Sequence, residues 1–307
     1  MNKIKIGIGF GQWKYGLPDP ELLCTSAETA EAAGLDSLWL SDHIVTLNPT
    51  LDITCVFAMI AGRTSRLKMG PSVLTLPARH PVQVAKTYAT LDYLSNGRMV
   101  MAVGSGNDTR DLVACGVPPQ ARGRRLEEGI EILRKLWTES NVTHHGEFYH
   151  FEDVTIEPKP KRGSLDIWIG GKSDAILKRV VRLGDGWFPA LTSPAEFQRD
   201  MEKLKMYGEE YGRVIDPREA GVLLFTHVCD DRAAAMKTVE PFFQGLRVDP
   251  EEIMQRSLIG SAQECIEQIE RFVEVGCDKF VLRPICPPED IASQLEHYGQ
   301  DILPHFV

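Results

Sequence analysis

Residues 20–43 read PELLCTSAETAEAAGLDSLWLSDH and contain one complete passage from a helix to a strand. Apolar residues recur at three- and four-residue spacing from Pro20 to Ala33, which predicts an amphipathic helix. Gly34 follows at the position where a helix often ends on a left-handed residue. The short apolar run Ser37–Ser41 then predicts a buried strand. Such a unit is typical of a parallel sheet whose strands are connected by helices.

The same alternation recurs along the whole chain. Eight strands are expected, at Lys3–Phe10, Ser37–Ser41, Leu67–Leu74, Arg98–Gly104, Asp166–Gly170, Gly186–Pro189, Gly221–Cys229 and Lys279–Arg283. Amphipathic helices are expected between them, at Pro20–Ala33, Gln83–Leu94, Gly123–Trp137, Ala175–Leu183, Ala195–Tyr211, Ala262–Val275 and Pro288–Ile302. Eight β/α repeats in 307 residues, with no linker rich in Pro, Gly or Ser, favour an α/β fold of the (β/α)8 TIM barrel type. Two doubly wound domains are the alternative.

We expect one barrel domain over residues 1–307, with insertions in two of its loops. The first insertion, at about residues 139–157, contains a short hairpin, and the second lies at about residues 240–258. Long loops that follow barrel strands commonly carry functional residues.

Composition narrows the class of protein. The chain has 34 Lys and Arg against 43 Asp and Glu, a net charge of -9 that argues against non-specific binding to nucleic acid or to anionic membranes. No apolar run approaches the roughly 18–20 residues that span a bilayer, so we expect a soluble, cytoplasmic protein. The seven cysteines are scattered and never form a C-x-x-C motif, which favours reduced core thiols over a disulfide framework or a metal site.

The active site of a (β/α)8 barrel lies at the carboxyl ends of its strands, so the residues at those ends are the candidate functional residues. His43 ends the second strand and is the catalytic candidate, because histidine exchanges protons near neutral pH. Alternatively, His43 is hydrogen-bonded to a neighbouring backbone group and has a structural role. Asp42 should point to the opposite face and anchor a loop.

Glycines mark two further strand ends. Gly170, Gly171, Lys172 and Ser173 precede a predicted helix and would offer backbone N–H groups, a hydroxyl and an ammonium group to a phosphate. Strand-to-helix turns favour Gly and Ser in any case, so the motif alone is weak. Gly104 and Gly106 lack the G-x-G-x-x-G continuation of a dinucleotide site, and would let a flat ring or a phosphate lie close to the backbone.

A series of ordered blocks resembles the bacterial-luciferase-like superfamily. They are Ser41–His43, Ser72–Thr75, His80–Gly106, Arg124–Trp137, Gly146–Tyr149, Pro158–Pro160, Ile167–Gly171, Leu183–Pro189 and Gly260–Ser261. The resemblance covers nearly the whole chain and is closest to the branch that uses coenzyme F420, a 5-deazaflavin. It implies a (β/α)8 oxidoreductase that transfers a hydride between the deazaflavin C5 and a small organic substrate.

Two other functions remain open. One is an FMN-dependent two-component monooxygenase that receives reduced flavin from a partner reductase. The other is a barrel that has lost activity and only binds a flavin-like ligand. Family members are commonly homodimers, so a homodimer is expected here.

The resemblance also implies roles for individual residues. A non-prolyl cis peptide at Ser72-Val73 would back the ring, His43 would lie near its reactive edge, and Gly170–Ser173 would hold the cofactor phosphate. Cofactor contacts are also expected from Thr75, Gly104, Gly106 and Asn107. The chain departs from the branch at Asn107–Arg110, where an aromatic or acidic residue is common, so no substrate is carried over. Substrate contacts are hypothesised for Gln12, Trp13, His227 and Arg283, and Arg283 would favour an acidic substrate unless it is a structural ion-pair partner.

Overall fold

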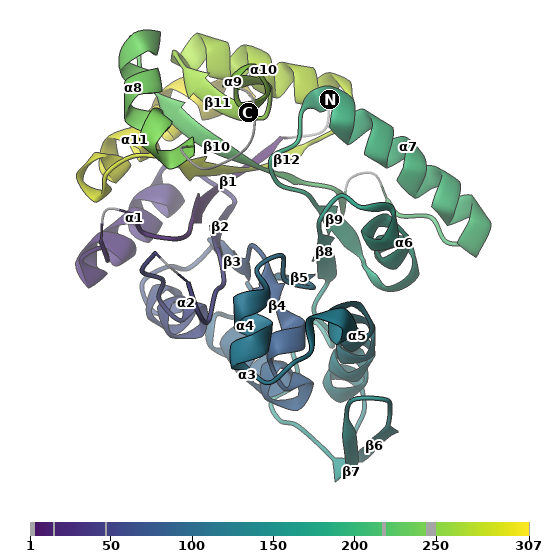
Figure 1. The fold of residues 1–307 in the computed structure, drawn as a ribbon. Coiled ribbons are helices and arrows are strands. Elements are labelled where there is room, and N and C mark those ends of the chain that lie inside the picture. The colour runs from purple at the N-terminus through teal and green to yellow at the C-terminus, as the bar shows by residue number, and fades with distance from the viewer. Residues whose placement is uncertain (1–3, 15, 47, 217–218, 244–249, 307) are drawn as a thin grey trace.

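Eight short parallel strands follow one another in a ring (Figure 1). The computed structural model describes residues 4–14, 16–46, 48–216, 219–243 and 250–306. The ring strands are β1 (Lys5–Phe10), β2 (Ser37–Leu40), β3 (Lys68–Pro71), β5 (Met101–Gly104), β8 (Ile167–Gly170), β9 (Gly186–Phe188), β10 (Val222–Val228) and β12 (Lys279–Pro284). Seven of them lie within stretches that the sequence predicts as strands, and β12 extends one residue beyond the predicted Lys279–Arg283.

Backbone pairing shows how the ring is connected. One ladder runs in the order β10, β12, β1, β2, β3 and a second runs β4, β5, β8, β9, where β4 is Leu74–Thr75. Parallel bridges join them, at Met69 with Met99 on one side and at Trp187 with Ala220 on the other. The strand neighbours therefore return to β1, and the predicted TIM barrel is confirmed.

Helices cover the outside of the ring, as Figure 1 shows. They are α1 (Pro20–Ala32), α2 (Ile53–Ala61), α3 (Pro81–Leu94), α5 (Arg122–Thr138), α6 (Asp174–Leu183), α7 (Pro194–Tyr211), α8 (Arg232–Phe243), α10 (Ala262–Glu274) and α11 (Ile291–His297). A large apolar core lies between these helices and the strands. A smaller one contains Trp39, Trp168, Phe188 and Phe225, with the Trp39 and Phe188 rings stacked 4.8 Å apart. None of the described helices is long and apolar enough to cross a membrane.

Elements outside the simple repeat lie in the loops. The antiparallel hairpin of β6 (Val142–His145) and β7 (His150–Val154) precedes β8 and projects from the barrel in Figure 1. The stretch 240–258 contains the end of α8, then α9 (Pro250–Gln255) and the start of β11 (Ser257–Gly260), which pairs with β10. Residues 244–249 of that stretch lie outside the described residues. A short helix, α4 (Thr109–Ala114), follows β5.

Candidate active site

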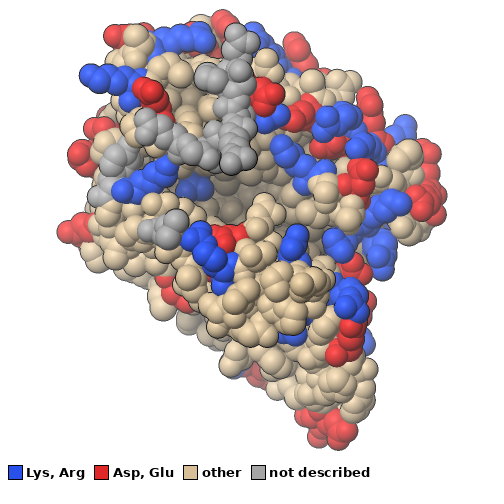
Figure 2. Space-filling model, in the orientation of Figure 1, with Lys and Arg blue, Asp and Glu red and all other residues tan. Residues whose placement is uncertain are grey.

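The face of the molecule drawn in Figure 2 is hollowed near its centre, over the strands that lie at the centre of Figure 1. Lysine and arginine side chains border the hollow in this view. The strands of the ring are parallel, so their carboxyl ends meet at one end of the barrel. The predicted site residues all follow strands at that end, and the structure shows which of them come together.

His43 pairs with a buried carboxylate that comes from another loop. Its Nδ1 lies 3.2 Å from Oδ2 of Asp111 in α4, and the two side chains are 24% and 1% exposed. Oδ1 of Asp111 accepts the backbone N–H groups of Ile44 (2.9 Å) and Val45 (2.6 Å). Asp111 thus fixes both the loop after β2 and the imidazole ring. With Nδ1 bound to Asp111, the lone pair or proton at Nε2 is the one available to a ligand.

Asp42 serves a different purpose. Both of its carboxylate oxygens accept hydrogen bonds of 2.8 Å from the guanidinium group of Arg79. Oδ2 also accepts the backbone N–H of Thr75 at 3.1 Å. Asp42 therefore anchors β4 and the loop that leads to α3, as the alternation of side chains along the strand predicts.

The peptide bond between Ser72 and Val73 is cis, as the resemblance implies. Val73 packs against two glycines: a Cβ atom at Gly104 would lie 2.6 Å from one Val73 methyl group, and one at Gly170 would lie 2.7 Å from the other. Only glycine leaves room for Val73 at these strand ends. The hydroxyl of Ser72 is buried and has no hydrogen-bond partner among the described residues.

Thr75 and Gly106 also meet, because a Cβ atom at Gly106 would lie 2.9 Å from the Thr75 methyl group. Gly106 has a φ of +82°, a conformation that side chains other than glycine rarely adopt. Asn107 follows it on the surface. Thus Thr75, Gly106 and Asn107 lie at the same end of the barrel as Val73.

The predicted phosphate site lies at the start of α6. Ser173 caps this helix, is exposed, and makes no capping hydrogen bond with its side chain. The N–H groups of Asp174 and Ala175 have no partner among the described residues, so they are available to an anion. The ammonium group of Lys172 donates to the carbonyl of Leu191 at 2.6 Å, and desolvation lowers the Lys172 pKa. Lys172 is therefore tied to the loop after β9 rather than extended into solvent.

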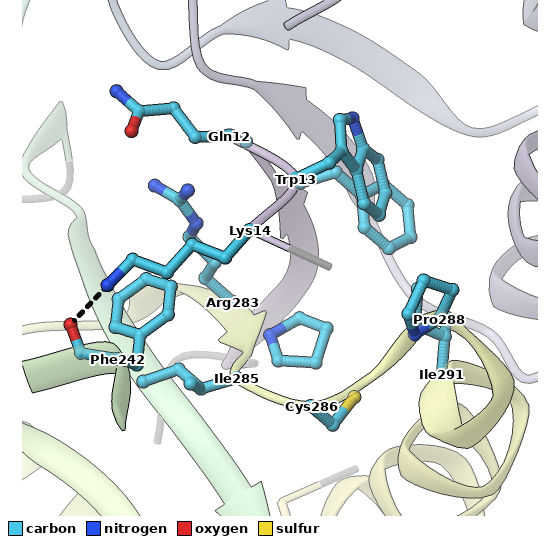
Figure 3. Close-up of a pocket in the computed structure, with 12 residues that line it drawn as sticks. Gln12, Trp13, Lys14, Phe242, Arg283, Ile285, Cys286, Pro288 and Ile291 are labelled. Carbon is cyan, nitrogen blue, oxygen red and sulfur yellow. Dashed lines mark hydrogen bonds between the residues drawn. The ribbon is translucent and has the colours of Figure 1, made fainter. Parts of the chain in front are cut away.

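Three of the four predicted substrate residues line one pocket, which we call the Arg283 pocket (Figure 3). Gln12, Trp13 and Arg283 line it together with Lys14, Phe242 and Ile291. His227 is buried and is not among its lining residues; its Nδ1 has no hydrogen-bond partner in the described part of the chain. Burial lowers the pKa of His227.

Asp111 was not identified from the sequence as the partner of the candidate residue His43. It lies 68 residues from His43 along the chain, so no local spacing connects them. The one available signal was Asp108, which caps α4 and marks the start of a helix directly after the β5 glycines. Among the described residues, no group of three or more His, Cys, Asp or Glu could hold a metal ion.

Known proteins resemble this chain along most of its length. Residues 9–250 match the model of the luciferase-like monooxygenase family. An F420-dependent glucose-6-phosphate dehydrogenase of Kineococcus radiotolerans is 33% identical over 317 residues, covering 93% of this chain and 93% of that protein.

Two solved structures share the fold. An F420-dependent secondary alcohol dehydrogenase, solved with an F420-acetone adduct, superposes with a TM-score of 0.85 at 22% identity, covering 99% of this chain and 98% of its own. The oxygenating constituent of the 3,6-diketocamphane monooxygenase of Pseudomonas putida, solved with FMN, has a TM-score of 0.85 at 17% identity and covers 99% of each chain.

Proposed function

Because the chain belongs to the luciferase-like monooxygenase family, we propose that it is a coenzyme F420-dependent oxidoreductase that transfers a hydride between the cofactor and a small organic substrate. The observation that carries this proposal is the 33% identity, over 93% of both chains, to an F420-dependent dehydrogenase. The site supports it with a paired histidine, an apolar platform and a free helix start at one end of the barrel.

The residues present fit a deazaflavin. Val73 forms an apolar surface that Gly104 and Gly170 leave room for, and the unpaired Ser72 hydroxyl lies beside it. These would hold the ring. The Ser173 hydroxyl and the free N–H groups at the start of α6 would hold the phosphate. A bound 5-deazaflavin supplies the hydride acceptor or donor at its C5.

The chain's own part of the reaction is proton transfer and positioning. When a substrate alcohol becomes a carbonyl, it loses a hydride and a hydroxyl proton, and Nε2 of His43 takes that proton. Asp111 keeps the proton of neutral His43 on Nδ1 and stabilises the imidazolium that forms. In the reverse direction, the protonated Nε2 returns the proton to the carbonyl oxygen.

An FMN-dependent monooxygenase is the second candidate, and the likeness to an FMN-containing oxygenase favours it at the level of the fold. The two functions differ in how the reduced cofactor meets oxygen, because a deazaflavin carries carbon at position 5 and resists forming the peroxide of flavin monooxygenases. That second function would also require a reductase partner.

Parallel titrations with F420 and FMN test the proposal. Binding is followed by the absorbance and fluorescence of each cofactor, in the oxidised and reduced states. Tight binding of F420, followed by its reduction or oxidation with a substrate, is expected. Tight binding of FMN alone would refute the proposal and favour the monooxygenase.

We also propose that the protein acts as a homodimer in the cytoplasm. All seven cysteines are free thiols in the structure, which suits a reducing compartment. Closed twofold dimers are the commonest assemblies of soluble enzymes. Sedimentation velocity at micromolar concentration measures the oligomeric state, and a monomer would contradict this part.

A further inference from the structure

Arg283 has no acidic partner among the described residues. It lies near the end of β12, opposite Phe225 of β10, and its guanidinium carbon is 5.3 Å from the centre of the Phe225 ring. Its one hydrogen bond within the described residues is a 3.1 Å contact from Nη1 to the Ser41 hydroxyl. A guanidinium group has five N–H donors, so most of them are unused.

Several other partly buried arginines of this chain have more partners than Arg283, whereas Arg125 lies over the rings of Phe148 and Tyr149. The guanidinium group of Arg98 donates to four backbone carbonyls and one hydroxyl. Carboxylates pair with Arg79, Arg134, Arg179 and Arg256. A cation that is removed from water without such partners is costly to a folded protein, so its retention points to a ligand that completes it.

The surroundings of Arg283 are cationic and donor-rich. None of the twelve described residues that line the Arg283 pocket is acidic, although the chain carries a net charge of -9. The guanidinium group lies against the backbone of Gly11, where any side chain would overlap it. Burial lowers the pKa of Arg283 to about 10, with no carboxylate contributing, so the group is still a cation at neutral pH.

Gln12 adds a second donor. Asn48 donates to Oε1 of Gln12 at 2.9 Å, which leaves the NH2 group of Gln12 free to donate. Figure 3 shows the polar ends of Gln12, Lys14 and Arg283 on one side of the pocket and Trp13 and Ile291 on the other. The pocket therefore presents donors on one side and an apolar wall on the other, as an organic anion requires.

We propose that the Arg283 pocket binds a carboxylate group of the substrate, so that the enzyme acts on organic acids. The guanidinium fork matches a carboxylate with two parallel hydrogen bonds and one compensating charge. A phosphate dianion would need a second free cation, whereas the Lys14 ammonium group already donates to the carbonyls of Phe242 (2.8 Å) and Pro241 (3.4 Å). This inference rests on the proposed function, and it names the class of substrate for the same site.

Binding of small anions to the purified enzyme tests the inference without turnover. Isothermal titration calorimetry is carried out with acetate, lactate and benzoate, and with benzamide as the neutral analogue of benzoate. Glucose 6-phosphate and inorganic phosphate test the alternative anion. We expect at least one carboxylate to bind the wild type, and benzamide to bind at least tenfold more weakly than benzoate.

Variants assign the binding to this pocket. Arg283→Met is expected to weaken carboxylate binding at least tenfold and Arg283→Lys to weaken it less, because the charge remains without the fork. Gln12→Glu, which changes a surface loop and introduces a competing carboxylate, provides the same test should Arg283→Met fail to fold. Arg63→Met is the control, because Arg63 is an exposed guanidinium that pairs with Glu21 and Glu28.

Three results would overturn the inference. The first is that no carboxylate binds, and the second is that carboxylates bind equally to the wild type, to Arg283→Met and to Gln12→Glu. The third is that phosphate compounds alone bind in a manner that depends on Arg283. The F420 titration separates these results from failure of the proposed function. An enzyme that binds F420 but no carboxylate keeps the proposed function and loses this inference.

Discussion

Replacing Asp111 by Asn tests the proton-transfer role of His43 with little change of shape. The new amide oxygen still accepts the N–H groups of Ile44 and Val45, but an NH2 group now faces Nδ1 of His43. That NH2 group donates, so Nδ1 must become the acceptor and the proton of the neutral ring moves to Nε2. His43 then cannot accept a proton at Nε2 from the substrate.

The structure sets the size of both effects. Two backbone hydrogen bonds change from a charged to a neutral acceptor, at about 1 kcal/mol each, so the free energy of unfolding should fall by about 2 kcal/mol. General acid–base catalysis contributes about 10²- to 10⁴-fold, so the hydride-transfer rate should fall by that factor, equivalent to about 3–5 kcal/mol of barrier. F420 affinity should change less than threefold, because Asp111 supports the histidine rather than the cofactor platform.

Stopped-flow absorbance of F420 in single turnover measures the rate, with the hydroxy acid lactate as the first substrate and isopropanol and glucose 6-phosphate for comparison. The matched control is Asp301→Asn, since Asp301 pairs through Oδ2 with Nδ1 of His297 in an exposed pair outside the candidate site. His43→Ala should lose as much rate as Asp111→Asn, and the double variant should lose no more than His43→Ala alone. Wild-type turnover in Asp111→Asn, or a double variant that multiplies the two losses, would refute the mechanism.

Three further changes test other parts of the site and fold. Ser173→Asp places a carboxylate at the proposed phosphate position and should weaken F420 binding at least tenfold in a fluorescence titration, whereas unchanged affinity would place the phosphate elsewhere. Gly104→Ala should lower the free energy of unfolding by about 1–3 kcal/mol and weaken F420 binding, because its Cβ would lie 2.6 Å from Val73, whereas Gly62→Ala, with 3.6 Å of clearance, should cost little in urea denaturation. The hydrogen bond from the Ser261 N–H lowers the pKa of Glu264, so Glu264→Gln should lower the free energy of unfolding at pH 7 by at most about 0.5 kcal/mol, because solvent screens this partly exposed carboxylate. That difference should disappear as the pH falls through the lowered pKa, and a constant difference between pH 7 and pH 3 would contradict the assignment.

The barrel could be predicted from the sequence because buried parallel strands read as short apolar runs. Every ring strand overlaps a predicted run, although β5 begins at Met101 rather than at Arg98 and β12 ends at Pro284 rather than at Arg283. Helix α2 escaped prediction because Ile53–Ala61 is apolar at every position except Thr54, so no helical period is visible. Strand β11 (Ser257–Gly260) was missed because it joins the sheet outside the β/α repeat, beside β10.

The candidate site, like the fold, could be predicted only in part. Topology alone places His43, Val73 and Gly170 at one end of the barrel, since each follows a strand, and a sequence can reveal this. The partner of His43 is chosen by tertiary packing across 68 residues, and nothing local in the sequence marks it. That no described carboxylate pairs with Arg283 was equally hidden, because its neighbours come from segments that are far apart in the sequence.

The adjacent residues Asp42 and His43 connect two parts of the candidate site. Asp42 is buried and is held by Arg79 and the Thr75 N–H, and this fixes the chain that follows the Ser72-Val73 peptide. His43 pairs instead with Asp111. Because the two residues are adjacent in the chain, a substitution that displaces Asp42 is expected to displace both the imidazole and the chain after Val73. The Asp42–Arg79 ion pair therefore helps to set the distance between the proposed proton-transfer group and the proposed cofactor platform.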